Sequence, residues 1–390
     1  MSGAATVSAP DARAAAEAAA QGASLAVRLV RPEDPDWDAS LQDVPRDVFH
    51  AAGFHRWSAG SGEGEAFLCV VGDHRRGLAW PYLLRPVADV PELAGERATD
   101  VTSVYGYPGP LAWGCGAGDP FLVSAWGAVA ATWRRQGAVA AFTRFHPLLD
   151  NASLLPGWRV DRPDVGLTPV IDVGPTVSVD CTVDDDVAGA GYARALRQHL
   201  AAARREGLTT VHDTTFGSLD VFARLYGQTM LRNRATPRYL WELADFERLL
   251  QALPERVHLL VTRERNAVAA AGLFTELDGI VQAFLIASDD AFRLLSPSKL
   301  LLDDARRWAR RRGDAVLHLG GGRGGRPDSL LRFKGEFSPL RHTFSVGRWV
   351  LDAAGYAELC ERRRSAIRGS VRLDEDFFPV YRAPLVGDGA

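Results

Sequence analysis

The chain has 390 residues and a formal net charge of −3, from 48 acidic and 45 basic side chains. At roughly 150 residues per domain, this length favours two domains and excludes a single small module. Hydrophobic residues make up 47% of the chain and charged residues 24%, which are values typical of a globular protein. The near balance of charge excludes nonspecific binding of nucleic acid or membranes over the whole surface, so any anion site has to be local.

Cysteine usage and the N-terminal segment indicate the compartment. The four cysteines are far apart and form no CxxC pair, so neither a disulfide framework nor a metal cluster is expected. No apolar run approaches the roughly 18 residues of a membrane span, and the N-terminus lacks the basic-then-apolar order of a signal peptide. We therefore expect a soluble cytoplasmic protein without a membrane span. The sequence does not indicate its oligomeric state.

Lysine is almost absent from the chain. The 45 basic residues comprise 43 arginines and 2 lysines, Lys299 and Lys334. An ammonium group is compact and can change its pKa, whereas a guanidinium stays charged. The two lysines are therefore candidates for roles that arginine cannot fill, with chance survival as the alternative.

The hydrophobic pattern predicts the same series of elements twice. Residues 1–24 are rich in alanine without apolar periodicity, so we expect a disordered tail. The first series is three strand segments, a helix and a further strand, at residues 65–71, 78–87, 101–113, 120–135 and 138–145. The second series repeats this order at residues 257–262, 268–276, 280–287, 297–312 and 315–319. Helices that open the second copy are predicted at residues 191–206, 218–232 and 243–253.

This repetition predicts tandem copies of one unit built from helices and strands. We place the N-terminal domain at residues 25–175 and the C-terminal domain at residues 176–355, with an acidic linker near residues 174–190. Residues 356–390 are expected to form an extension that packs back on the domains. In each copy the chain leaves the third strand for a helix and returns beside that strand, which favours a cleft where the two strands splay apart.

Seven short segments carry a resemblance to a known family. They are residues 103–111 (SVYGYPGPL), 145–151 (FHPLLDN), the arginine-rich helix from Tyr192, and residues 226–239 (YGQTMLRNRATPRY), 296–301 (SPSKLL), 318–325 (HLGGGRGG) and 331–339 (LRFKGEFSP). In this order they resemble the GNAT acyltransferase superfamily, and more closely the FemABX-type transferases. The resemblance covers roughly residues 25–355 and implies an α+β fold, with two tandem GNAT-like domains whose mixed, mostly antiparallel sheets are flanked by helices. It also implies an amide-forming enzyme that passes an amino acid from aminoacyl-tRNA to an amine, either of a cell-wall precursor or of a small metabolite.

Two departures from the family pattern bear on the substrates. A GNAT enzyme that uses acetyl-CoA usually has a glycine-containing phosphate loop before the helix that follows the splayed strand. Here residues 294–301 (LLSPSKLL) contain no glycine, which disfavours a tight CoA clamp. We therefore expect no resident cofactor, with aminoacyl-tRNA as the donor co-substrate and acyl-CoA as the alternative. Residues 111–114 (LAWG) lack the acidic residue that the peptidoglycan enzymes tend to show, which leaves the acceptor open.

Lys334 is the leading candidate for a catalytic group. In the family the matching Phe-Lys pair, here Phe333 and Lys334, lies at the donor side of the active site. The resemblance thus implies that Lys334 contacts a phosphate or the terminal ribose, or stabilises developing negative charge; a solvated lysine on a strand edge is the alternative. His146 ends the last strand of the first copy and is the candidate general base, although it can also merely cap that strand.

Two further sets of residues are expected to bind the substrates. The donor set lies at the start of the helix from residue 297 and beside the Phe-Lys pair, and comprises Ser296, Ser298, Lys299 and Arg332. The acceptor set combines aromatic and guanidinium side chains, and comprises Tyr105, Tyr107, Arg144, Arg232, Arg238 and Tyr239. The alternatives are a plain helix cap for the first set, and packing or surface ion pairs for the second.

Arginine-rich helices at residues 194–205 and 306–312 are expected to contact tRNA phosphates despite the acidic total charge. Two other functions stay open at this point. One is an acyl-CoA-dependent N-acyltransferase, and the other is a non-catalytic binding protein built from two GNAT-like domains.

Overall fold

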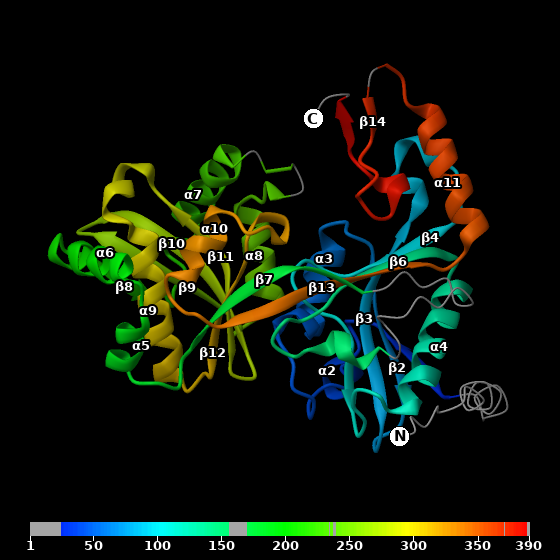
Figure 1. Ribbon diagram of the computed structural model, residues 1–390, viewed down its shortest axis with the longest axis horizontal. Helices are drawn as coiled ribbons and strands as arrows, with labels where there is room; N and C mark the ends of the chain where they lie inside the picture. The colour runs from blue at the N-terminus through cyan, green and yellow to red at the C-terminus, as the bar shows by residue number, and fades with distance from the viewer. Residues whose placement is uncertain (1–24, 156–169, 234, 237–238, 370, 388–390) are drawn as a thin grey trace, which may run out of the picture.

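The computed structural model describes residues 25–155, 170–233, 235–236, 239–369 and 371–387. The predicted tail at residues 1–24 and the predicted acceptor residue Arg238 lie outside these residues. The described residues form two halves that lie side by side, and two long strands cross between them (Figure 1).

The N-terminal half contains the first predicted series. Its strands are β1 (Val27–Val30), β2 (Glu65–Gly72), β3 (Gly77–Pro86), β4 (Thr99–Thr102), β5 (Leu111–Trp113) and β6 (Ala138–Arg144). Its helices are α2 (Asp36–Ala39), α3 (Ala52–Gly60) and α4 (Pro120–Arg135), with 3-10 turns η1 (Val48–His50), η2 (Val87–Asp89), η3 (Pro91–Leu93) and η4 (Asn151–Leu154). Helix α4 begins where the sequence indicates, because the Asp119 carboxylate caps the amide of Phe121 and proline occupies the first turn.

The C-terminal half contains the second series. Its strands are β7 (Ile171–Asp180), β8 (Leu208–His212), β9 (Val257–Glu264), β10 (Ala267–Leu277), β11 (Ile280–Ser288), β12 (Val316–Gly321) and β13 (Arg341–Val350). Its helices are α5 (Asp185–Gly191), α6 (Arg194–Arg205), α7 (Leu219–Arg232), α8 (Leu243–Ala252), α9 (Pro297–Arg312) and α10 (Ser329–Gly335), with 3-10 turns η7 (Asp290–Leu295) and η8 (Arg323–Gly325). Helix α9 ends at Gly313, whose φ of 90° is the left-handed conformation that glycine adopts without strain.

Among the described residues, thirteen strands join into one mixed sheet. Its order is β1-β2-β3-β4-β6-β13-β7-β12-β11-β10-β9-β8, and β5 pairs with β3 outside this path. Most pairs are antiparallel, with β4–β6 and β11–β12 parallel. The order on one side of the centre mirrors the order on the other, and helices flank the sheet. The α+β class and the GNAT-like tandem are therefore confirmed, although the two expected sheets are continuous with each other.

The central strands β7 and β13 are exchanged between the halves. Strand β7 follows the N-terminal series but pairs with β12 of the C-terminal half, while β13 follows the C-terminal series but pairs with β6 of the N-terminal half. The two strands also pair with each other and cross between the halves (Figure 1). The predicted linker at residues 174–190 is wrong, because β7 and α5 occupy most of it.

In each half the parallel pair ends early and the two strands then diverge. The ladder between β11 and β12 stops at Gln282 and His318, and the ladder between β4 and β6 stops at Val101 and Ala141. The splay that the sequence predicts is therefore present in both copies. Beyond these last pairs the two strands of each copy no longer form backbone hydrogen bonds with each other. Their free backbone groups can therefore contribute to a binding site at both points.

A shared hydrophobic core joins the two halves. Helix α3 packs on helix α8 so closely that a Cβ at Gly53 would lie 2.0 Å from the carbonyl oxygen of Ala252. The Trp57 indole donates a hydrogen bond to the Asp245 carbonyl across the same contact at 3.0 Å. The core cluster contains buried side chains from both series, so the relative position of the halves is fixed by packing as well as by strand exchange.

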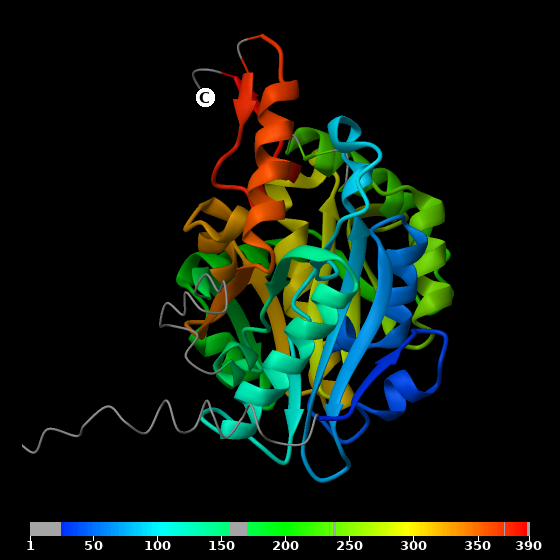
Figure 2. The same cartoon turned by 90° about the vertical axis from the view of Figure 1, so that its right-hand side faces the viewer.

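The segment after residue 352 packs against the N-terminal half. It comprises helix α11 (Ala353–Ala366), strands β14 (Val371–Leu373) and β15 (Leu385–Gly387) and the 3-10 turn η9 (Val380–Arg382), and it projects at the top of both views (Figures 1 and 2). The fully buried carboxylate of Asp100 on β4 accepts hydrogen bonds from Arg85, Tyr381 and Arg382. Within the described residues, no helix is long and apolar enough to span a membrane.

Candidate active site

A pocket of about 590 Å³ lies where the two splays meet. The N-terminal half contributes Tyr105 and Tyr107 from the loop after β4 and Arg144 from the end of β6. The C-terminal half contributes Phe284 of β11 and the glycine-rich segment at residues 319–325. The crossing strands β7 and β13 complete the wall. Neither half alone contains the site, and the volume suits a small molecule or the end of a larger one.

Lys334 lies at one end of this pocket. Its helix, α10, is capped by the Asp328 carboxylate, and its ammonium donates a hydrogen bond to the Gly321 carbonyl at 2.7 Å. Lys334 forms no ion pair with a carboxylate of the described residues. Burial lowers the pKa of Lys334 to about 8, while the charge of Asp328 acts in the opposite direction. The ammonium is thus partly desolvated, which suits a group that meets negative charge on a ligand or passes on a proton.

Gly320 brings two polar groups together at this end. A Cβ on Gly320 would lie 3.3 Å from the Lys334 Nζ and 3.5 Å from the Tyr107 hydroxyl. Its φ of 74° is also a conformation that side-chain-bearing residues rarely adopt. The Lys334 ammonium and the Tyr107 hydroxyl therefore both lie beside the backbone of Gly320. A substrate carbonyl or phosphate at this place could accept hydrogen bonds from both groups.

The described pocket lining carries positive charge only. Its charged side chains are Arg144, Arg323 and Lys334, and no aspartate or glutamate is among the described lining residues. Arg144 donates to the Ser103 hydroxyl at 3.3 Å and stacks on Phe142, while Arg323 donates to Asn233 at 3.2 Å. Arg323 also pairs at 3.7 Å with the carboxylate of Asp328, which is not among the described lining residues. The described lining itself presents cations and no carboxylate, which favours an anionic group in the pocket.

Aromatic rings form another part of the pocket lining. We call Tyr105, Tyr239, Trp241 and Phe284 the aromatic wall; all four are half-buried and line the pocket. The Tyr105 ring centroid lies 5.8 Å from each of the other three, and Trp241 stacks on Phe284 at 6.1 Å. Because these rings pack on one another, the wall is a stiff apolar surface.

A buried polar network crosses the interface between the halves and reaches the pocket lining at Gln282. The Asp47 carboxylate accepts hydrogen bonds from His146 Nε2 at 2.8 Å and from Gln282 Nε2 at 2.5 Å. The Gln282 oxygen in turn accepts from His318 Nδ1 at 2.8 Å, and the buried His318 Nε2 has no hydrogen-bond partner among the described residues. Burial lowers the pKa of His318 well below its usual value, so this imidazole is neutral. The network ties η1 and β6 of one half to β11 and β12 of the other.

His146 belongs to this network and does not line the pocket. Its Nδ1 accepts the backbone amides of Leu148 and Leu149, and its Nε2 is held by Asp47. Both ring nitrogens are engaged, so the predicted general base has no lone pair available for a substrate proton. The histidine orders the turn after β6, as in the capping alternative.

The predicted donor set lies elsewhere. Lys299 is buried at the start of α9, where its ammonium contacts Glu336 Oε2 at 2.6 Å and His199 Nδ1 at 3.1 Å. Ser296 adopts the left-handed conformation with φ of 50° and caps α9 without a side-chain hydrogen bond, and Ser298 lies in the same turn. None of these residues lines the pocket, and the ion pair already neutralises Lys299.

The remaining predicted residues divide between the pocket and its surroundings. Tyr105, Tyr107, Arg144 and Tyr239 line it together with Lys334. Phe333 points to the core, where its ring packs on Phe337 at 5.9 Å, and Arg332 is exposed on α10. Arg232 forms an ion pair with Asp290 at 2.5 Å, as in the surface-pair alternative.

Several residues of the site were not predicted from the sequence. They are Phe49, Asp47, Trp241, Gln282, Phe284 and Arg323. One signal was available: Gln282 is the single polar residue within the strand segment 280–287 (IVQAFLIA), and a buried amide needs partners. The others carry no local signal, because their roles depend on contacts between the halves.

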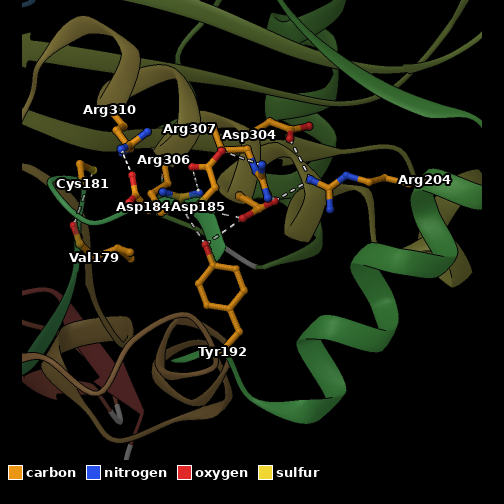
Figure 3. A network of polar contacts seen from close by, with 11 residues as sticks. Val179, Cys181, Asp184, Asp185, Tyr192, Arg204, Asp304, Arg306, Arg307 and Arg310 are labelled. Atoms are coloured by element: carbon orange, nitrogen blue, oxygen red, sulfur yellow. Dashed lines mark hydrogen bonds and ion pairs between the residues drawn. The ribbon is translucent and has the colours of Figure 1, made fainter. Parts of the chain in front are cut away.

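Most arginines of α9, together with Arg204 of α6, form ion pairs within the C-terminal half (Figure 3). Arg306, whose side chain is 1% exposed, pairs with Asp185 at 2.7 Å, and Arg204 pairs with Asp303 at 2.6 Å. Arg306 cannot reach a phosphate, so the prediction of tRNA contacts is wrong for this residue. Arg194, Arg197 and Arg205 on α6 are exposed.

Comparisons with known proteins support the fold. Residues 182–334 match the family described as acetyltransferase (GNAT) domain. A crystal structure of FemX is similar with a TM-score of 0.63 at 14% identity, covering 85% of this chain and 99% of that one. The C-terminal domain of a putative lysylphosphatidylglycerol synthetase from Agrobacterium fabrum is similar with a TM-score of 0.53 at 17% identity, covering 87% and 98%. No curated protein matches the sequence.

Proposed function

Because the chain has the tandem GNAT fold of an acyltransferase, with a GNAT domain at residues 182–334, we propose that it transfers an aminoacyl group from aminoacyl-tRNA to an amine. The acceptor is an amine of a cell-wall precursor or of a small metabolite. The observation that carries this proposal is the placement of Lys334, a desolvated ammonium in a cationic pocket between the halves.

The residues present suit the chemistry of amide formation. The amine nitrogen bonds to the ester carbonyl, the bond to the 3′ oxygen of the donor breaks, the nitrogen loses a proton and the leaving oxygen gains one. Lys334 and the Tyr107 hydroxyl converge beside Gly320, where they can stabilise the oxyanion and supply the proton. A protein nucleophile is not needed in this route.

The start of helix α9 supports a donor other than CoA. In GNAT enzymes that use CoA, backbone amides at this place bind the pyrophosphate, and the family resemblance puts that site at residues 294–301. Here the Glu336 carboxylate occupies the vicinity of the first turn and pairs with Lys299 at 2.6 Å. A second negative charge would be repelled by Glu336 and would compete for Lys299.

The test compares donors and variants of the full chain. The protein is incubated with a pool of charged tRNAs, with or without ribonuclease, or with acyl-CoAs, using amine acceptors from a host extract and mass spectrometry as the readout. We expect an amide product that disappears after ribonuclease treatment and falls at least about 100-fold with Lys334→Met. Arg332→Met is the matched control, because this exposed cation lies on the same helix outside the pocket. A product that requires acyl-CoA alone would refute the proposed donor.

The non-catalytic alternative makes a different prediction. It expects no product with any donor and no effect of Lys334→Met on function in the cell. The desolvated ammonium argues against it, because an unpaired buried charge destabilises a protein that has no use for it.

A further inference from the structure

The aromatic wall is exposed within the pocket although its rings are large and apolar. Its four residues are half-buried and line the cavity of about 590 Å³ that Lys334 also lines. Phe49 connects the wall to Tyr107: its ring centroid lies 6.4 Å from that of Phe284 and 5.8 Å from that of Tyr107. A continuous apolar surface therefore extends from the wall to the place where Lys334 and Tyr107 converge.

The charges around this surface restrict what it can hold. The described lining offers no carboxylate for a cationic side chain. Most of the wall's surface is ring carbon, so an acidic or strongly polar side chain that lies against it loses more hydration than the few polar groups of the wall restore. An acyl group that carries only a hydrogen atom or a methyl group as its side chain would leave the aromatic rings exposed to water.

We propose that the acyl group transferred at this site carries an aromatic or large branched apolar side chain, seated against the aromatic wall with its carbonyl directed at Lys334. This inference rests on acyl transfer in this pocket, as proposed above, but not on the identity of the carrier. The wall then acts as the element that selects the acyl group.

The experiment measures binding of stable donor analogues to the full chain by titration calorimetry. One series joins L-phenylalanine, L-leucine, L-alanine or L-lysine by an amide bond to 3′-amino-3′-deoxyadenosine 5′-phosphate. The other series compares phenylacetyl-CoA with acetyl-CoA. We expect the phenylalanine and leucine analogues to bind at least about tenfold more tightly than the alanine and lysine analogues, since the wall buries the larger apolar side chain.

Variants of the aromatic wall test whether the wall causes the preference for large apolar side chains. Trp241→Ala is expected to reduce the preference for phenylalanine over alanine to less than about threefold while binding of the alanine analogue changes little. Trp113→Ala is the matched control, because Trp113 is a half-buried tryptophan that lines a different hollow. Phe284→Leu keeps an apolar side chain and is the second variant if Trp241→Ala does not fold.

The outcomes separate this inference from the proposed donor. Equal binding of all four nucleotide analogues overturns the inference and leaves aminoacyl transfer standing. If no nucleotide analogue binds but phenylacetyl-CoA binds at least about tenfold more tightly than acetyl-CoA, the aromatic acyl site is supported and the tRNA donor is refuted. A lack of preference in both series overturns the inference.

Discussion

Replacement of Lys334 by methionine is expected to stabilise the protein while abolishing its chemistry. The pKa of Lys334 falls from its usual 10.5 to about 8, because burial penalises the ammonium. At about 1.4 kcal/mol per tenfold change in proton affinity, keeping this group charged costs the folded state roughly 3 kcal/mol. The substitution also removes the hydrogen bond to Gly321, and the side chain is only half-buried. These two offsets leave a net stabilisation of about 1–2 kcal/mol near pH 7.

The pH dependence of this effect has a defined sign. Since the folded-state pKa is lowered, the unfolded chain binds more protons than the folded chain between pH 8 and pH 10.5. The stability of the parent protein therefore rises with pH over that window, whereas methionine does not titrate. The advantage of Lys334→Met is expected to be largest at and below about pH 8 and to vanish by about pH 10.

Urea unfolding followed by tryptophan fluorescence, at about pH 7 and about pH 10, measures both effects. Lys299→Met is a control for which the opposite effect is expected. It leaves Glu336 without its ion-pair partner and should lower the free energy of unfolding by roughly 1–2 kcal/mol. If Lys334→Met is less stable than the parent at both pH values by the same amount, the ammonium is not strained by burial. The argument for its catalytic role from desolvation then fails.

Three further substitutions test the interface and the pocket. Gln282→Leu removes a donor to the buried Asp47 carboxylate and is expected to lower the free energy of unfolding by about 2–3 kcal/mol; a urea midpoint that does not move would contradict the network. Gly320→Ala places a methyl group 3.3 Å from Lys334 Nζ and is expected to lower the transfer rate at least about tenfold, and an unchanged rate would show that the ammonium is not positioned there. Asp100→Asn weakens the docking of the C-terminal segment and is expected to speed proteolysis of residues 371–387, with equal cleavage rates as the refuting result.

Local sequence patterns were sufficient to predict the helices and strands and the repetition of their order. The predicted helix at residues 120–135 and the helix at residues 297–312 both match the structure, because proline at the first turn and apolar periodicity act within one segment. The scarcity of lysine also directed attention to Lys334, which lies in the pocket. The scarcity of lysine did not distinguish Lys334 from Lys299. Lys299 is neutralised by its ion pair with Glu336, and that pair depends on how α9 packs against the end of α10.

The tertiary structure alone decided which strands pair across the centre and which side chains share the pocket. Residues 174–190 were predicted to form an acidic linker, but β7 gains hydrogen bonds on both edges once β12 and β13 flank it. Likewise Asp47 and Gln282 are 235 residues apart and acquire a common role only where the halves pack together. Helix ends and apolar periodicity are encoded within a few turns of chain, whereas strand exchange, ion pairing and burial are set by the surfaces that meet after folding.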